Sequence, residues 1–177
     1  PPPLHTIAIA VLLVSAASAV AQQPALQRVA RVATSYGANM VLDLARQRPV
    51  MVCGDDTFEW MGNSWVHRAV VPGLSIQNDT LTYDSQRGVC VLFGTRQQTW
   101  EFDGRDWHQR YPSTDAPMQG ARLAYDPSRN RTVGFSGVST SPWQAETWEW
   151  DGTNWTPIAP ALHPPARAYH AMAFDPA

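Results

Sequence analysis

The side chains best suited to chemistry in this chain are carboxylates that return at regular intervals. They are Glu59, Glu101 and Glu149, each between two aromatic residues, and Asp103 and Asp151, each before a glycine. Two carboxylates can act as acid and base on a glycosidic bond, but that reaction needs one defined separation between two unlike environments. Because these carboxylates recur at the same position of a repeat, we interpret them as structural.

Other catalytic and metal-binding patterns are weak. Asp103-Gly104-Arg105-Asp106 resembles a calcium loop but lacks the alternating oxygen ligands of one, so we interpret it as a turn. The serines lie in no nucleophile elbow, the cysteines lack zinc spacing, and all 13 basic residues are arginine, so no lysine can form a Schiff base. The sequence predicts no catalytic residue, no metal and no cofactor in these 177 residues.

Candidate ligand-binding residues lie where the repeat is interrupted. The longest interruption, residues 138–144, carries a tryptophan whose ring could stack on a sugar or an aromatic ligand; alternatively it folds back onto a neighbouring unit. Arginines between the units could grip carboxylate or sulfate groups, or could simply be solvated. The candidates are Trp143, Arg96, His67, Arg68, Tyr111, Arg167 and His170.

These residues are positioned by a sequence repeat. Its second copy consists of four motifs, Tyr83-Asp84-Ser85-Gln86-Arg87, Val91-Leu92-Phe93-Gly94, Thr99-Trp100-Glu101-Phe102-Asp103-Gly104 and Trp107. The third copy has the same motifs in the same order, Tyr125-Asp126-Pro127-Ser128-Arg129, Val133-Gly134-Phe135-Ser136-Gly137, Thr147-Trp148-Glu149-Trp150-Asp151-Gly152 and Trp155. A weaker copy precedes them and a fourth begins at residue 172. The turn aspartates Asp43, Asp84, Asp126 and Asp175 are spaced by 84−43 = 41, 126−84 = 42 and 175−126 = 49 residues. Such periods indicate propeller blades or solenoid units.

Each copy contains four short extended segments separated by turn signals. In the third copy the pattern predicts strands over 121–125, 132–135, 145–150 and 154–158. Asp-Pro starts the first turn, and Asp-Gly is a strong hairpin signal for the last. Trp150 and Trp155 face each other across that hairpin and should fix its register. Four antiparallel strands in a repeat of this length predict a β-propeller blade.

With these motifs, the chain resembles the exported bacterial kelch-repeat proteins, whose propeller is similar to the central domain of galactose oxidase. The resemblance covers residues 36–177 and is clearest over 166–175, whereas the family's double glycine is reduced to Gly54, Gly94 and Ser136-Gly137. It implies an all-β, kelch-type propeller fragment of about three four-stranded antiparallel blades plus the start of a fourth. The expected blades are 36–70, 78–112, 120–160 and a partial 166–177. No stretch matches the copper site of galactose oxidase, so that activity is not carried over, and Asp151-Gly152-Thr153-Asn154-Trp155 resembles the sialidase aspartate box only loosely.

The N-terminal residues predict export. An apolar run over 7–21 ends Ala19-Val20-Ala21, as in a signal peptide before its cleavage site; a retained anchor is the alternative. We expect residues 1–21 to be a signal peptide that lacks its start, and the protein to be periplasmic or extracellular in a bacterium. Since a closed propeller has 4 to 8 blades, we expect either that the natural chain continues or that copies assemble into a ring. Residues 22–35 are then a possible ring-closing strand.

An exported protein can form disulfides, and there are two cysteines. Superposing Gly54 on Gly94 puts Cys53 and Cys90 at sites three residues apart, on opposite sides of a strand. We therefore expect two buried free thiols and no bridge.

The formal charge of −2 argues against a nucleic-acid partner, which would require a basic surface. Our first hypothesis is an exported binding or scaffold module for glycans or protein partners, with no membrane contact after signal cleavage. The alternative is the propeller of a larger secreted carbohydrate-active enzyme, oxidase-like or sialidase-like, whose catalytic residues lie elsewhere. A purely structural surface repeat is a third hypothesis.

Overall fold

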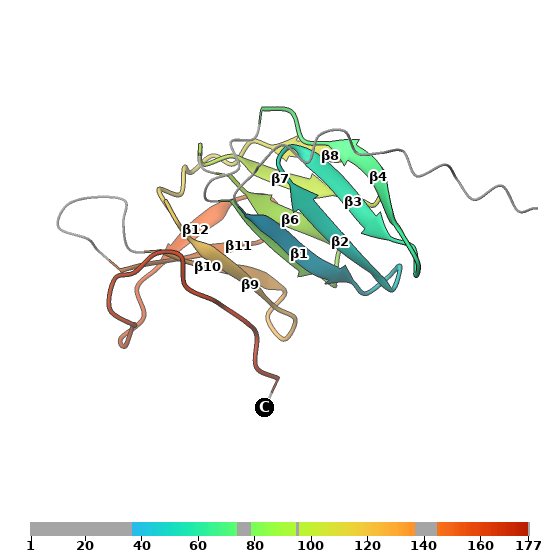
Figure 1. The fold of residues 1–177 in the computed structure, drawn as a ribbon. Helices are drawn as coiled ribbons and strands as arrows, with labels where there is room; N and C mark the ends of the chain where they lie inside the picture. Colours follow the sequence, from blue (N-terminus) through green and yellow to red (C-terminus); the bar gives the residue numbers. More distant parts are fainter. Residues whose placement is uncertain (1–36, 74–78, 95, 137–144, 177) are drawn as a thin grey trace, which may run out of the picture. The chain divides into compact units, whose positions relative to one another are not determined.

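The computed structural model describes residues 37–73, 79–94, 96–136 and 145–176. The chain divides into two compact units, 1–31 and 32–177, and every described residue belongs to the second. In the described ranges the chain forms twelve β-strands and no helix (Figure 1). None of the described residues therefore provides a helix of the length and hydropathy that a membrane span requires.

The strands form three four-stranded antiparallel sheets, each built from consecutive strands. Sheet 1 contains β1 (Ala38–Asp43), β2 (Arg48–Cys53), β3 (Asp56–Trp60) and β4 (Trp65–Val70). Sheet 2 contains β5 (Thr80–Asp84), β6 (Val89–Phe93), β7 (Thr99–Phe102) and β8 (Trp107–Arg110). Sheet 3 contains β9 (Arg122–Asp126), β10 (Arg131–Ser136), β11 (Glu146–Trp150) and β12 (Trp155–Ile158). The predicted all-β class, the four-stranded antiparallel sheets and the strands of the third copy are confirmed, with bounds shifted by at most a few residues.

Aspartate side chains shape both tight turns of sheets 2 and 3 and the first tight turn of sheet 1. After the first strand of sheet 2, the Asp84 carboxylate accepts hydrogen bonds from the backbone N–H groups of Gln86 at 3.0 Å and Arg87 at 2.9 Å. In the last turn of the same sheet, Asp103 accepts from the N–H groups of Arg105 at 2.8 Å and Asp106 at 2.9 Å. A short side chain that bonds its own backbone two and three residues ahead replaces ladder bonds and so ends a strand.

The core lies between successive sheets in two clusters of buried side chains. We call the face of a sheet that packs on the next sheet in sequence its forward face, and the opposite face its rear face. The first cluster joins the forward face of sheet 1 to the rear face of sheet 2 and contains Val50, Val52, Leu81, Tyr83, Cys90, Leu92, Trp100 and Phe102. The second joins the forward face of sheet 2 to the rear face of sheet 3 and contains Val91, Phe93, Leu123, Trp148, Trp150 and Trp155. The first strands β1, β5 and β9 are neighbours in that order.

Polar side chains cross the same interfaces. The indole N–H of Trp107 donates to the hydroxyl of Thr57 in sheet 1 at 2.8 Å. One repeat later, the indole N–H of Trp155 donates to Thr99 in sheet 2, also at 2.8 Å. The same hydrogen bond therefore ties each of these two pairs of sheets together.

No disulfide joins the two cysteines, as expected, and Cys90 is buried whereas Cys53 is only half-buried. Burial raises the pKa of the Cys90 thiol to about 12, so this thiol stays protonated and packs as a small apolar side chain. The expected superposition of Gly54 on Gly94 is wrong by one residue. Val50 lies opposite Glu59 as Val91 lies opposite Glu101, so Cys53 is the counterpart of Gly94.

Candidate functional site

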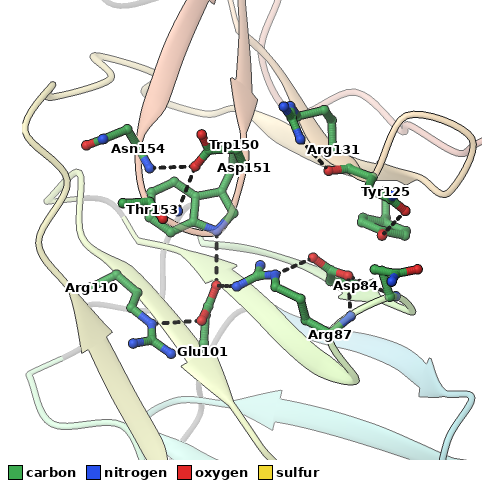
Figure 2. Close-up of polar contacts among 12 residues, drawn as sticks. Asp84, Arg87, Glu101, Arg110, Tyr125, Arg131, Trp150, Asp151, Thr153 and Asn154 are labelled. Atoms are coloured by element: carbon green, nitrogen blue, oxygen red, sulfur yellow. Dashed lines mark hydrogen bonds and ion pairs between the residues drawn. The ribbon is translucent and has the colours of Figure 1, made fainter.

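The repeated glutamates pair with arginines of their own sheets, and Glu101 also joins sheet 2 to sheet 3. Glu101 is buried and accepts from the guanidinium of Arg87, from Arg110 Nε at 2.7 Å and from the indole of Trp150 in sheet 3 at 3.0 Å (Figure 2). Arg87 also donates to Asp84 Oδ2 at 2.8 Å. Burial alone would lower the pKa of Arg87, but its bonds to Glu101 and Asp84 outweigh burial and raise it, so the guanidinium stays charged.

The other two sheets contain related junctions. In sheet 1, Glu59 accepts from Arg68 Nε at 2.8 Å and lies 3.4 Å from Arg46 Nε. In sheet 3, Glu149 pairs with Arg129, whose Nε lies 2.7 Å from Asp126. These carboxylates are occupied by arginines that belong to the same repeat, which supports a structural role for all three.

The aspartates that precede glycines, Asp103 and Asp151, hold the last turns of sheets 2 and 3. Burial of the Asp103 carboxyl acts to raise its pKa, but hydrogen bonds from the Asp106 and Arg105 amides and from His108 lower it to about 2. Asp151 accepts from the amides of the residues two and three positions ahead in the equivalent turn. Within the described ranges no group of three His, Cys, Asp or Glu side chains is placed to hold a metal ion.

Two of the candidates from the sequence are engaged in sheet 1. His67 lies 2.9 Å from Asp56 Oδ1, and its ring packs edge-on against Phe58 at 5.5 Å. Arg68 belongs to the Glu59 junction. Both side chains therefore make contacts within sheet 1 in this structure.

Two more candidates, Arg96 and Tyr111, are exposed at the edge of sheet 2 that carries the β6–β7 loop and the end of β8. The Tyr111 hydroxyl donates to Gln109 Oε1 at 3.0 Å. The candidate Trp143, the expected signal peptide over 1–21 and the segment 22–35 lie outside the described residues.

The structure brings two candidates together: Arg167 and His170 line a cavity of about 390 Å³ on the forward face of sheet 3. The His170 ring packs edge-on against Phe135 at 5.5 Å, and neither ring nitrogen has a hydrogen-bond partner among the described residues. Burial, and then the charges of Arg122 and Arg167, lower the pKa of His170, so the imidazole is neutral at pH 7.

The sequence reasoning missed a second hollow, which we call the loop-edge groove. It has a volume of about 380 Å³ and lies at the edge of sheet 3 where β11 begins and β12 ends. Its lining includes Glu146, Thr147, Trp148, Ile158 and His163. The Trp148 indole N–H donates to Glu146 Oε2 at 3.4 Å.

A weak signal for this groove exists in the sequence. The position before the repeated threonine is Asp56 in sheet 1, Gln98 in sheet 2 and Glu146 in sheet 3, so it is always polar but never the same residue.

A third hollow, of about 450 Å³, is lined by the first strands of the three sheets and by Met172, Ala173 and Phe174. Residues 159–176 contain no strand.

Comparison with known proteins finds matches among solved structures. No protein family and no curated protein matches the sequence. Among solved structures, one that resembles the chain is that of a fucose lectin from Kordia zhangzhouensis in complex with methyl-fucoside, with 18% sequence identity and a TM-score of 0.41. That match covers 70% of this chain and 98% of the lectin chain.

Proposed function

We propose that this chain is part of an exported kelch-type propeller that binds saccharides in the loop-edge groove of sheet 3. The observation that carries the proposal is the composition of that groove, where an indole, a carboxylate, an imidazole and a hydroxyl line one hollow of about 380 Å³. Trp148, Glu146, His163 and Thr147 supply them. This combination suits a ligand with an apolar ring face and several hydroxyl groups.

The propeller part of the proposal rests on how the sheets follow one another. Each interface joins a forward face to a rear face, with an indole of the later sheet bonded to a threonine of the earlier one. Repeats that bury their faces only against neighbours are typical of propellers and solenoids. The first strands β1, β5 and β9, in contact in sequence order, are the innermost strands of such a propeller.

The choice of a saccharide rests on the polar groups that line the groove. Glu146 supplies a carboxylate and His163 an imidazole, whereas the candidates His67 and Arg68 make contacts within sheet 1. The carboxylate and imidazole can exchange hydrogen bonds with vicinal hydroxyl groups, and the indole edge and Ile158 provide an apolar wall. The groove also lies on the edge where the interruptions of the repeat emerge, which is where the sequence predicts binding.

The test is a glycan array followed by calorimetric titration of the best glycan. Glu146→Gln and His163→Ala should each weaken binding at least tenfold, because each removes a group that orients hydroxyls. Asp115→Asn and His108→Ala, exposed changes of the same chemical kind away from the groove, should leave affinity unchanged. Array silence, or equal affinity for all four variants, would reject the saccharide proposal.

A further inference from the structure

Two sheet faces have no partner sheet among the described residues. On the rear face of sheet 1, Met40 is 62% exposed, Leu42 47% and Trp65 37%. On the forward face of sheet 3, Val133, Thr147 and Glu149 are half-buried, and the cavity of about 390 Å³ lies against the first two. By strand position, the rear face of sheet 1 corresponds to the rear faces of sheets 2 and 3, which are buried between sheets. The forward face of sheet 3 corresponds in the same way to the buried forward faces of sheets 1 and 2.

The covered forward face of sheet 2 shows what such a face binds. Thr99 and Glu101 accept the indole N–H groups of two tryptophans from sheet 3, Trp155 at 2.8 Å and Trp150 at 3.0 Å (Figure 2 shows the second bond). Phe93 packs edge-on against Trp155 at 5.4 Å. A threonine, a glutamate and an apolar ring therefore form a receptor for a tryptophan pair.

Sheet 3 has the same receptor without the tryptophans. By strand register, Thr147 opposite Phe135 corresponds to Thr99 opposite Phe93, and Glu149 opposite Val133 corresponds to Glu101 opposite Val91. Among the described residues, no indole donates to Thr147 or to Glu149.

Sheet 1 has the matching donors. Trp60 and Trp65 pair across the β3–β4 hairpin with ring centroids 5.4 Å apart, as Trp150 and Trp155 do across β11–β12. In the described part of the chain neither indole N–H has a hydrogen-bond acceptor. The donors on one end of the three-sheet unit and the acceptors on its other end are complementary.

We propose that a second copy of this chain docks head-to-tail, its sheet 1 rear face on the sheet 3 forward face. Trp60 of the incoming copy donates to Glu149, and Trp65 donates to Thr147. The two faces differ, so the contact is heterologous and closes if the rotation between copies is right. Two copies of three sheets would make 2 × 3 = 6, within the 4 to 8 blades of known propellers.

The segment over 160–172 already lies against part of the receiving face. Its counterpart between sheets 2 and 3 includes Met118 and Ala121, which share the forward face of sheet 2 with Trp155, so a linker and a tryptophan can occupy one face together. Residues 172–174 lie near the position that β1 of the incoming copy requires. They form no strand with the described residues, so moving them disrupts no sheet.

The experiment measures the mass of the full chain by light scattering and sedimentation over a wide range of concentration. We expect twice the monomer mass at the higher concentrations. Leu42→Asp on the donor face and Glu149→Arg on the acceptor face should each give monomers, whereas Tyr111→Asp, at a site 81% exposed, should remain dimeric. Unchanged thermal unfolding at low concentration establishes that each variant is folded.

Mixing the two monomeric variants tests the head-to-tail geometry. The Leu42→Asp copy retains a native acceptor face and the Glu149→Arg copy a native donor face, so one native contact can form and the mixture should regain dimers. A wild-type chain that is monomeric at every concentration overturns the proposal, as does a dimer that both variants leave intact. A dimer that only one of the two variants disrupts would indicate a contact of like faces and would also overturn it, as would a mixture that forms no dimers. None of these outcomes depends on saccharide binding.

Discussion

At the scale of single residues, the same carboxylate type has different consequences in different sheets. Glu101 is 1% exposed and holds Arg87, Arg110 and the indole of Trp150, so it joins two sheets. Glu149 holds Arg129 at a more exposed site. Replacing a buried charged residue leaves its former partners buried without a counter-charge, which destabilises the fold. An exposed ion pair contributes little to stability, because water can solvate both of its members.

We therefore predict that Glu101→Ala costs about 3 kcal/mol of unfolding free energy. Glu149→Ala should cost about 1 kcal/mol or less, because the guanidinium of Arg129 is half exposed and water can solvate it. Urea unfolding followed by tryptophan fluorescence measures both values. Equal losses for the two variants would contradict the role of Glu101 as a junction between sheets.

The second prediction at this scale concerns His170. Its pKa is lowered in the folded state from the ordinary 6.5, so below about that pH the unfolded chain binds more protons than the folded one. Stability is then fully present above the unfolded pKa and falls as the pH drops below it. Unfolding free energies measured from about pH 7 to about pH 5 should show this decline, and His170→Gln should remove that part of it. The turn aspartates Asp103 and Asp126 have pKa values lowered from 3.8 to about 2. Their contribution to the unfolding free energy is therefore lost at a lower pH than that of His170, when the pH falls below the ordinary pKa of the unfolded carboxyls.

At the scale of elements, the last turn of sheet 2 is held by sheet 1. The Arg46 guanidinium donates to the carbonyl of Asp103 at 2.6 Å, and a Cβ on Gly104 would collide with that guanidinium. Gly104 has φ +97°, and Gly62, in the equivalent turn of sheet 1, has φ +92° with nothing within 4 Å of a Cβ. The two glycines share a backbone conformation and differ in whether another sheet touches them.

This difference predicts the outcome of two alanine substitutions. Gly62→Ala should cost about 1 kcal/mol, the penalty for a side chain in the left-handed region. Gly104→Ala should cost about 1 kcal/mol more, because it also displaces Arg46 from Asp103. Urea unfolding of both variants and of the Arg46→Ala, Gly104→Ala double variant tests this, since the extra loss should vanish once Arg46 is absent. An extra loss that persists would show that the Arg46 contact does not matter.

Many of the strands and turns could be predicted from the sequence. The period, the Asp turns and the tryptophan hairpins are local patterns, and they predicted the strands of the third sheet. The register of sheet 1 could not be predicted, because β2 and β3 are joined by a tight turn at Gly54 and Asp55 whereas β6 and β7 are joined by a longer loop. The Arg46 contact and the Glu101–Trp150 bond join residues of different sheets, at separations of 57 and 49 residues, and no local pattern encodes them. The loop-edge groove was missed for the same reason, since β11, β12 and the following linker come together to form it.

At the scale of the whole molecule, the three sheets follow one another in a series, and in the described ranges sheet 2 packs against both sheet 1 and sheet 3. Sheet 2 is buried on both faces, as the all-buried pattern of β5 and β7 shows, whereas alternate residues of β1 are exposed. In such an array, stability is approximately a sum of unit and interface terms, and units at the ends open first.

Hydrogen exchange should therefore be slowest in the strands of sheet 2 and faster in sheets 1 and 3. Local opening at an end breaks one interface, whereas exposing the amides of β6 and β7 requires both interfaces to open. If copies dock head-to-tail, raising the protein concentration should slow exchange in β1, β3 and β11, which lie at the proposed contact, and leave β6 unchanged. The Leu42→Asp variant provides the control, because its exchange should not depend on concentration. Uniform protection of all three sheets in this monomeric variant would instead mean that the unit unfolds in one cooperative step, and that the interfaces are stronger than the exposure of the two end faces implies.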